Sequence, residues 1–105
     1  MNRTLLLLGC LGANLMSANV QAQTPAPSAV QVRSWAAGCS GCHGTNGVAQ
    51  AGHVSLAGQN ADAMLKSLLD YKEGRRPATL MHQLAKGYSD AELKAIANYF
   101  AAQKN

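Results

Sequence analysis

The residues best suited to chemistry are two cysteines and a histidine that lie close together, Cys39-Ser40-Gly41-Cys42-His43. Two thiols at this spacing can form a short disulfide, act as a redox dithiol or supply half of a zinc site. A histidine directly after the second cysteine completes C-x-x-C-H, the attachment signature of covalently bound haem. In that chemistry both thiols form thioethers with the porphyrin, and the His43 imidazole becomes the proximal iron ligand.

The other interpretations of the cysteine pair have weaker support. A disulfide between residues so close in sequence closes a very short loop and stabilises little. A thioredoxin-like dithiol predicts alternating strands and helices, whereas the neighbouring segments have helical periodicity. A zinc site needs two more ligands, which His53 and His82 do not offer at the usual spacing. We therefore expect one haem c, attached through Cys39 and Cys42.

The first 22 residues have the pattern of an export signal. Arg3 gives a cationic start, residues 4–16 are rich in leucine, and Val-Gln-Ala ending at Ala22 is typical of a signal-peptidase site. The sequence before Cys10 also resembles a lipoprotein signal, but an acylated cysteine normally follows a longer apolar run. Cleavage after Ala22 is the preferred interpretation, and it predicts a periplasmic protein without a membrane span in the mature chain.

What remains is enough for one small domain. Residues 23–28 contain two prolines and are expected to be a flexible lead-in, and residues 29–105 are expected to form the domain. A core this small usually needs a disulfide, a metal or another cross-link. A haem would supply the missing apolar core.

Three helices are predicted by apolar side chains that recur at helical spacing. Ser28, Asn60 and Ser89 are the expected N-caps, and Ser89 with Glu92 forms a capping box. The apolar stripes are Val32-Trp35-Ala36-Cys39, Met64-Leu65-Leu68-Leu69 and Leu93-Ile96-Ala97-Phe100. Residues 44–59 and 75–88 are predicted loops. Without strand patterns, the expected fold is an all-α domain of three to four helices wrapped around one haem.

The iron needs a second axial ligand unless the site is open for chemistry. The possible side chains are Met1, Met16, Met64, Met81, His53 and His82. The first two methionines are lost with the signal peptide, and Met64 lies on an apolar stripe, where a core position is expected. Met81 is preferred, because it lies in a predicted loop and a thioether raises the potential. His82 is the competitor, and otherwise a solvent-exposed loop histidine; His53 is expected to be a loop residue.

With these residues placed, the chain resembles class I cytochromes c over nearly all of residues 30–103. The matching motifs are C-x-x-C-H-G-x-x-G at residues 39–47 and L-A-G-Q at residues 56–59. Residues 76–90, Arg-Pro-Ala-Thr-Leu-Met-His-Gln-Leu-Ala-Lys-Gly-Tyr-Ser-Asp, are similar to the methionine-ligand segment of the cytochrome subunits of flavocytochrome c sulfide dehydrogenases. The family usually has proline at the position of Val54, where the carbonyl accepts the N–H of the proximal histidine, and a small residue at the position of His82.

The resemblance implies Cys39 and Cys42 as thioether sites, His43 as proximal ligand and Met81 as distal ligand. It also implies a partner, an FAD flavoprotein that oxidises sulfide and passes electrons to this haem, with a downstream cytochrome or oxidase as acceptor. The chain alone would then be an electron-transfer protein and not an enzyme.

Two other functions remain open. One is a freely diffusing carrier that feeds an oxidase or reductase, and the other is a haem enzyme or gas sensor with an open sixth position. From residue 23 onward the chain has eight basic and five acidic side chains, a net charge of +3. This excess could steer docking to an acidic partner, although Lys72, Arg75 and Arg76 are expected to form a solvated face. Nucleic acid binding is excluded by the compartment.

Overall fold

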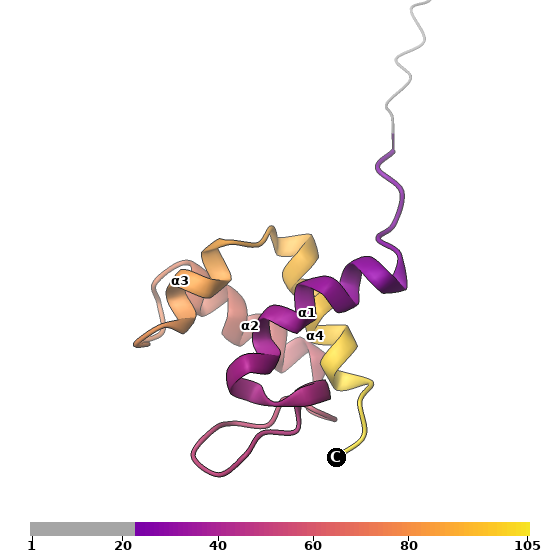
Figure 1. Ribbon diagram of the computed structural model, residues 1–105. Helices are drawn as coiled ribbons and strands as arrows, with labels where there is room; N and C mark the ends of the chain where they lie inside the picture. Colours follow the sequence, from indigo (N-terminus) through magenta and orange to yellow (C-terminus); the bar gives the residue numbers. More distant parts are fainter. Residues whose placement is uncertain (1–22) are drawn as a thin grey trace, which may run out of the picture.

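The computed structural model describes residues 23–105, and all regular structure in this range is helical (Figure 1). There are four α-helices and one short 3-10 helix: α1 (Ala29–His43), η1 (Thr45–Gly47), α2 (Ala61–Lys72), α3 (Met81–Lys86) and α4 (Asp90–Ala101). The prediction of an all-α domain with three to four helices is confirmed. The predicted signal peptide, including Cys10, lies outside the described residues.

The three long helices begin at the predicted polar residues. Ser28 and Asn60 each accept a hydrogen bond from the backbone N–H three residues further along the chain. Ser89 accepts one from the Glu92 N–H, and the Glu92 carboxylate accepts one from the Ser89 N–H. Each cap satisfies an amide that the helix itself leaves unpaired and contributes about 1 kcal/mol.

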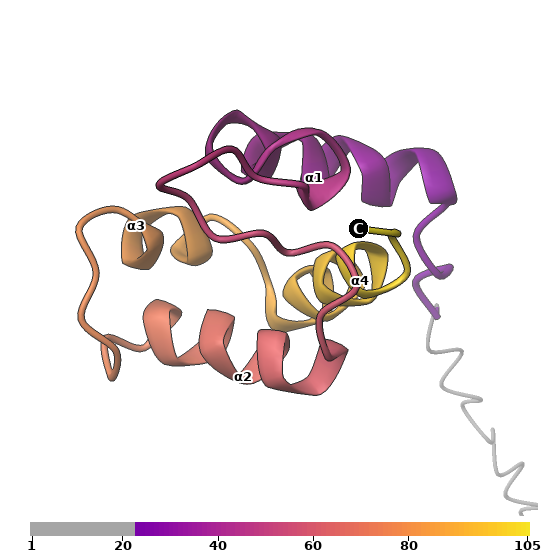
Figure 2. The ribbon, with the colours of Figure 1, turned by 90° about the horizontal axis from the view of Figure 1, so that it is seen from below.

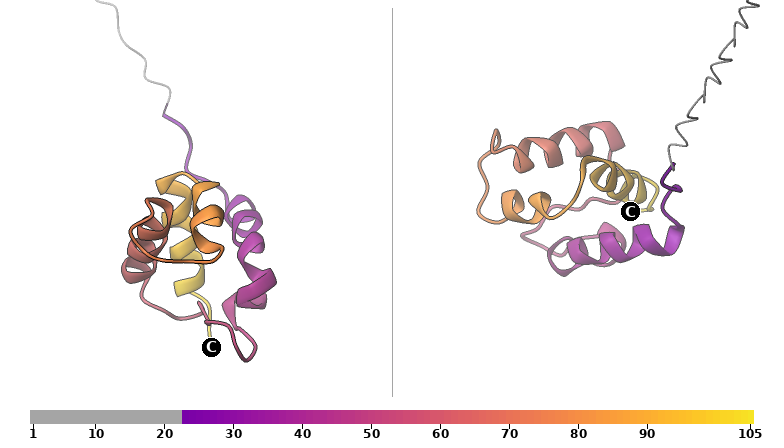
Figure 3. Two further views of the ribbon diagram at one scale, coloured as in Figure 1. Left: turned by 90° about the vertical axis from the view of Figure 1, so that its left-hand side faces the viewer. Right: turned by 90° about the horizontal axis from the view of Figure 1, so that it is seen from above.

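Helix α4 is central and packs against both α1 and α2 (Figure 2). Seen from two further directions, α1 and α2 lie on opposite sides of α4 (Figure 3). The core cluster joins Ala36 of α1 and Met64 of α2 to three residues of α4, Ile96, Ala97 and Phe100. The predicted apolar stripes therefore face one another in the core.

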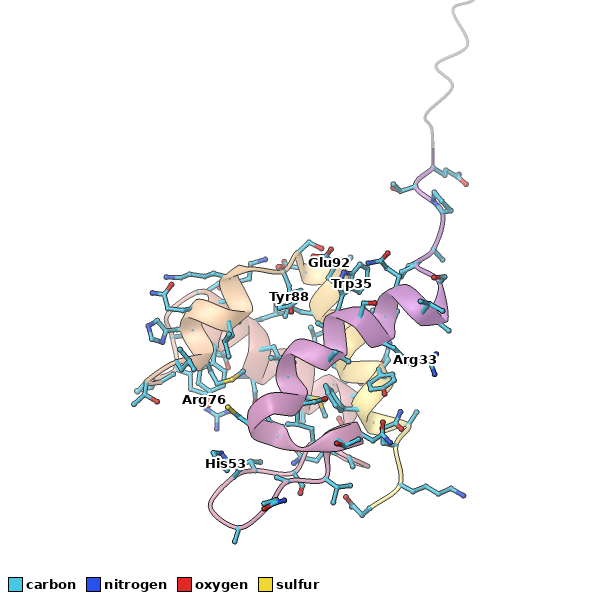
Figure 4. All side chains as sticks on the ribbon, in the orientation of Figure 1. Arg33, Trp35, His53, Arg76, Tyr88 and Glu92 are labelled. Atoms are coloured by element: carbon cyan, nitrogen blue, oxygen red, sulfur yellow. The ribbon has the colours of Figure 1, made fainter. Side chains whose placement is uncertain are left out.

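The contact between α1 and the start of α4 is made by Tyr88 and Trp35, which lie side by side (Figure 4). The Tyr88 hydroxyl donates to the Trp35 carbonyl at 3.3 Å. Burial raises the pKa of Tyr88, so its hydroxyl stays protonated, and able to donate, to higher pH than that of a free tyrosine. A Cβ at Gly38 would lie 3.0 Å from the Tyr88 hydroxyl oxygen, so glycine permits this close approach. The contact fixes α1 just before its two cysteines.

The prediction that residues 75–88 form a loop is wrong in part, because α3 lies within them. Helix α3 has only six residues and no side-chain hydrogen bond at its N-cap, Leu80. A helix of fewer than two turns is too short to show an apolar period. No helix within residues 23–105 combines the length and apolar character needed to cross a membrane.

Candidate functional site

The last two turns of α1 carry the cysteines and the histidine of the C-x-x-C-H motif. Helix α1 continues through the motif and ends at Gly44, whose N–H donates to the Ser40 carbonyl at 3.0 Å. Cys39 is partly buried against the core, Cys42 is exposed, and both thiols are free. One rigid helical turn therefore separates the two thiols, and His43 follows directly.

The environment of the cysteines does not favour the dithiol or zinc interpretations. Burial raises the pKa of the Cys39 thiol, whereas reactive redox thiols have a lowered pKa. Within residues 23–105, no group of three or more Cys, His, Asp or Glu side chains is close enough together to hold a metal ion. Burial therefore disfavours a thiolate at Cys39, and the pair has no further zinc ligands in this range.

His43 is oriented by a backbone carbonyl. Its Nδ1 lies 2.6 Å from the carbonyl oxygen of Val54, 11 residues further along the chain. In this pair Nδ1–H is the donor, which leaves Nε2 as the nitrogen with a free lone pair. The contact is the one expected for a proximal histidine. Valine makes it in place of proline because the acceptor is the main-chain oxygen.

The loop that presents the Val54 carbonyl is held by Gly47. The Gly47 carbonyl accepts hydrogen bonds from Leu56 N–H at 2.7 Å and from Ala57 N–H at 3.1 Å. Gly47 is buried, and a Cβ there would lie 2.7 Å from the Phe100 ring. Gly47, the last residue of C-x-x-C-H-G-x-x-G, thus holds the loop that carries the Val54 carbonyl against the core.

Met81 and His82 begin α3, at the same end of the molecule as the C-terminal half of α1 (Figure 2). Both side chains are partly buried, and Met64 lies in the core as predicted. The expectation that His82 is a solvent-exposed loop residue is wrong. Its Nδ1 is buried and has no hydrogen-bond partner within residues 23–105. Both candidates for the sixth ligand therefore lie on one helical turn.

His53 lies, as predicted, on a loop, which projects between η1 and α2, and its side chain is exposed (Figure 4). Its backbone N–H donates to the Gln50 carbonyl at 3.1 Å, and its side chain lines an open hollow together with Cys42. The hollow is at the surface beside the attachment motif.

Exposed apolar side chains flank both candidate iron ligands. Four of the five large apolar side chains that are exposed within residues 23–105 lie in two segments: Val48 and Val54 on the loop that binds His43, and Leu80 and Leu84 beside Met81. Their exposed fractions run from 42% to 64%, although such residues are normally buried. A large apolar group attached to the cysteines would cover this surface. The residues present therefore fit a haem, because they offer two thiols for attachment and, in His43 Nε2 and the Met81 thioether, two side-chain atoms that could ligate iron.

The known proteins to which this chain is similar include several cytochromes. The sequence pattern of the family described as cytochrome c matches residues 32–104. The chain is 40% identical over 62 residues to the cytochrome subunit of sulfide dehydrogenase of Chlorobaculum tepidum, an alignment covering 59% of this chain and 56% of that protein. It is 43% identical over 70 residues to cytochrome c4 of Pseudomonas aeruginosa, covering 66% of this chain and 35% of that protein. Identity to cytochrome c-553 of Helicobacter pylori is 32% over 92 residues, covering 86% of this chain and 96% of that protein.

Proposed function

The chain belongs to the cytochrome c family and is an electron carrier with haem c as its cofactor, and we propose that Cys39 and Cys42 hold this haem while His43 and Met81 ligate its iron. The observation that carries the proposal is the hydrogen bond from His43 Nδ1–H to the Val54 carbonyl. It fixes the tautomer that leaves Nε2 free, and it increases the basicity of that nitrogen.

The chain's own residues set the conditions for transfer. His43 is held by a helix end and a backbone carbonyl, and Met81 by the start of α3, so both side chains are positioned before an electron arrives. When bound, the iron alternates between the ferric and ferrous states, and a thioether ligand favours the ferrous one. If His43 and Met81 both ligated the iron, they would leave no position on it for a substrate.

The assignment of Met81 is tested by absorption spectroscopy of the ferric holoprotein. The wild type should show the charge-transfer band of methionine-ligated ferric haem at the red edge of the visible spectrum. We expect Met81→Ala to abolish the band, because no other described methionine outside the core is available. His82→Ala, the matched control at the next position, should retain it. A wild type without the band, or a band that persists in Met81→Ala, would contradict the assignment.

We further propose that the electron donor is an FAD-containing flavoprotein that oxidises sulfide, and that the acceptor is a downstream cytochrome or oxidase. The support is the 40% identity to a protein named as the cytochrome subunit of sulfide dehydrogenase. This chain spans about half the length of that relative, so the activity of the whole protein is a proposal here.

A freely diffusing carrier is the second candidate. It is favoured by the match to nearly the full length of a cytochrome c-553. Purifying the chain from its native host distinguishes the two candidate functions. A sulfide dehydrogenase subunit should co-purify with one flavoprotein, and sulfide should reduce it only in that protein's presence. A free carrier should elute alone as a monomer without flavin.

Export is part of the same proposal. Residues 1–22 would be removed, leaving a periplasmic chain with the lead-in 23–28 and the domain 29–105. The mass of the mature holoprotein tests this, because a chain beginning at Gln23 and an acylated chain beginning at Cys10 differ by 13 residues and a lipid.

A further inference from the structure

The segment between α2 and α4, residues 73–89, carries Met81 but has few buried residues of its own. Ala85 is its only buried residue, and residues 73–80 are all exposed. Helix α3 spans six residues, and a helix this short is not stable alone in water. The position of Met81 therefore depends on contacts between this segment, here called the distal segment, and the rest of the molecule.

Lys72 bridges the two ends of the distal segment. It is the last residue of α2, and its Nζ donates to the Tyr88 carbonyl at 2.8 Å and to the Asp90 carboxylate at 2.7 Å. Tyr88 and Asp90 stand where the distal segment ends and α4 begins. The Lys72 side chain is only 26% exposed, so the expectation that it belongs to a solvated face is wrong. Hydrogen bonds from a partly shielded ammonium group to two acceptors stabilise the structure more than an exposed ion pair does.

The same junction reaches α1. Tyr88, whose carbonyl accepts from Lys72, uses its hydroxyl to donate to the Trp35 carbonyl. One ammonium group thus links α2 to the residue that anchors the distal segment on α1. At the other end, Arg76 donates to the Ser67 hydroxyl at 2.8 Å and lies over the Tyr71 ring. The distal segment is held to α2 at its beginning and at its end.

We propose that Lys72 is a positioning residue that keeps Met81 on the iron by closing the distal segment. The inference rests on the proposed ligation by Met81. A segment fixed at both ends has few conformations in which its ligand is displaced, and release of one end increases their number. An external ligand can bind the iron only in the displaced state, so its apparent affinity rises in proportion to that population.

The test is imidazole binding to the ferric holoprotein, followed by absorbance. We expect Lys72→Leu to bind imidazole about tenfold more tightly than the wild type, as loss of a partly shielded charged hydrogen bond implies. Lys72→Arg keeps a charged donor at this position, so its imidazole affinity should lie close to that of the wild type. Lys66→Leu is the matched control, because among residues 23–105 Lys66 pairs only with Asp70 on the same helix, and its side chain is 79% exposed. It removes the same charge and should leave imidazole affinity unchanged.

A second variant covers the case in which Lys72→Leu yields no holoprotein. Asp90→Asn changes an exposed acceptor, keeps the Tyr88 contact, and should raise imidazole affinity by about two- to threefold. The inference would be overturned if Lys72→Leu bound imidazole with the affinity of the wild type. Where Lys72→Leu yields no holoprotein, an unchanged imidazole affinity in Asp90→Asn would overturn it. The inference would also be overturned if Lys66→Leu raised imidazole affinity as much as Lys72→Leu does. A wild type without the methionine band would overturn both this inference and the assignment of Met81. A wild type with the band and no effect at Lys72 would overturn this inference alone.

Discussion

The double variant Cys39→Ser with Cys42→Ser is expected to carry no covalent haem and to lose most of its helical structure. Only eight apolar residues of the described chain are buried, and four of them are alanines, Ala36, Ala57, Ala85 and Ala97. A domain of this size with so little buried volume is marginal without a cross-link or cofactor. Haem staining after denaturing electrophoresis measures attachment, and far-ultraviolet circular dichroism measures the helical content.

Ser40→Ala is the control for the double variant. Ser40 lies between the two cysteines, and its hydroxyl makes one long hydrogen bond, 3.5 Å, to the Ala36 carbonyl. Its loss should change neither haem content nor helical signal. A double cysteine variant that keeps the wild-type helical signal without haem would show that the protein core is sufficient alone, which contradicts this prediction.

Gly44→Ala is expected to destabilise the holoprotein by about 4 kcal/mol or more. Gly44 has φ 82° and ψ 161°, a region occupied essentially by glycine alone. A Cβ at this position would also lie 1.8 Å from the Val48 carbonyl oxygen, so the backbone after His43 would have to move. That movement would displace the loop whose Val54 carbonyl orients His43. Urea unfolding of the purified holoprotein gives the free energy of unfolding.

Gly74→Ala separates steric overlap from backbone strain. Gly74 has φ 75°, and apart from its chain neighbours no atom of the described residues lies within 4 Å of the position a Cβ would take. Only the left-handed backbone conformation is penalised there, at about 1 kcal/mol. Equal losses of stability in Gly44→Ala and Gly74→Ala would mean that the steric overlap with Val48 adds nothing to the destabilisation at Gly44.

Local signals in the sequence predicted the framework of the fold. Ser28, Asn60 and Ser89 cap their helices as expected, because capping depends on residues within three positions of each other. The central position of α4 follows from a stripe that is buried along its whole length, from Leu93 to Phe100. The attachment motif also needed only local information, since its three side chains lie on one helix.

Contacts between distant residues could not be predicted from periodicity. The bonds of Lys72 span 16 and 18 residues, so its sequence neighbours indicate only a charged helix end. Helix α3 was missed because six residues do not establish a period. The contact between His43 and Val54 was accessible only through the resemblance to a family. Any residue can supply a main-chain carbonyl, so the type of residue at position 54 does not reveal the acceptor. The proline that is usual in the family is also absent here.

Addition of carbon monoxide to the reduced holoprotein would show whether side chains of the protein fill both iron positions outside the porphyrin plane, as an electron carrier requires. We expect a spectrum unchanged by carbon monoxide, with the same low-spin bands before and after addition. A new carbon monoxide complex formed by the wild type at once and in full would contradict it, and would indicate a haem enzyme or gas sensor with an open sixth position.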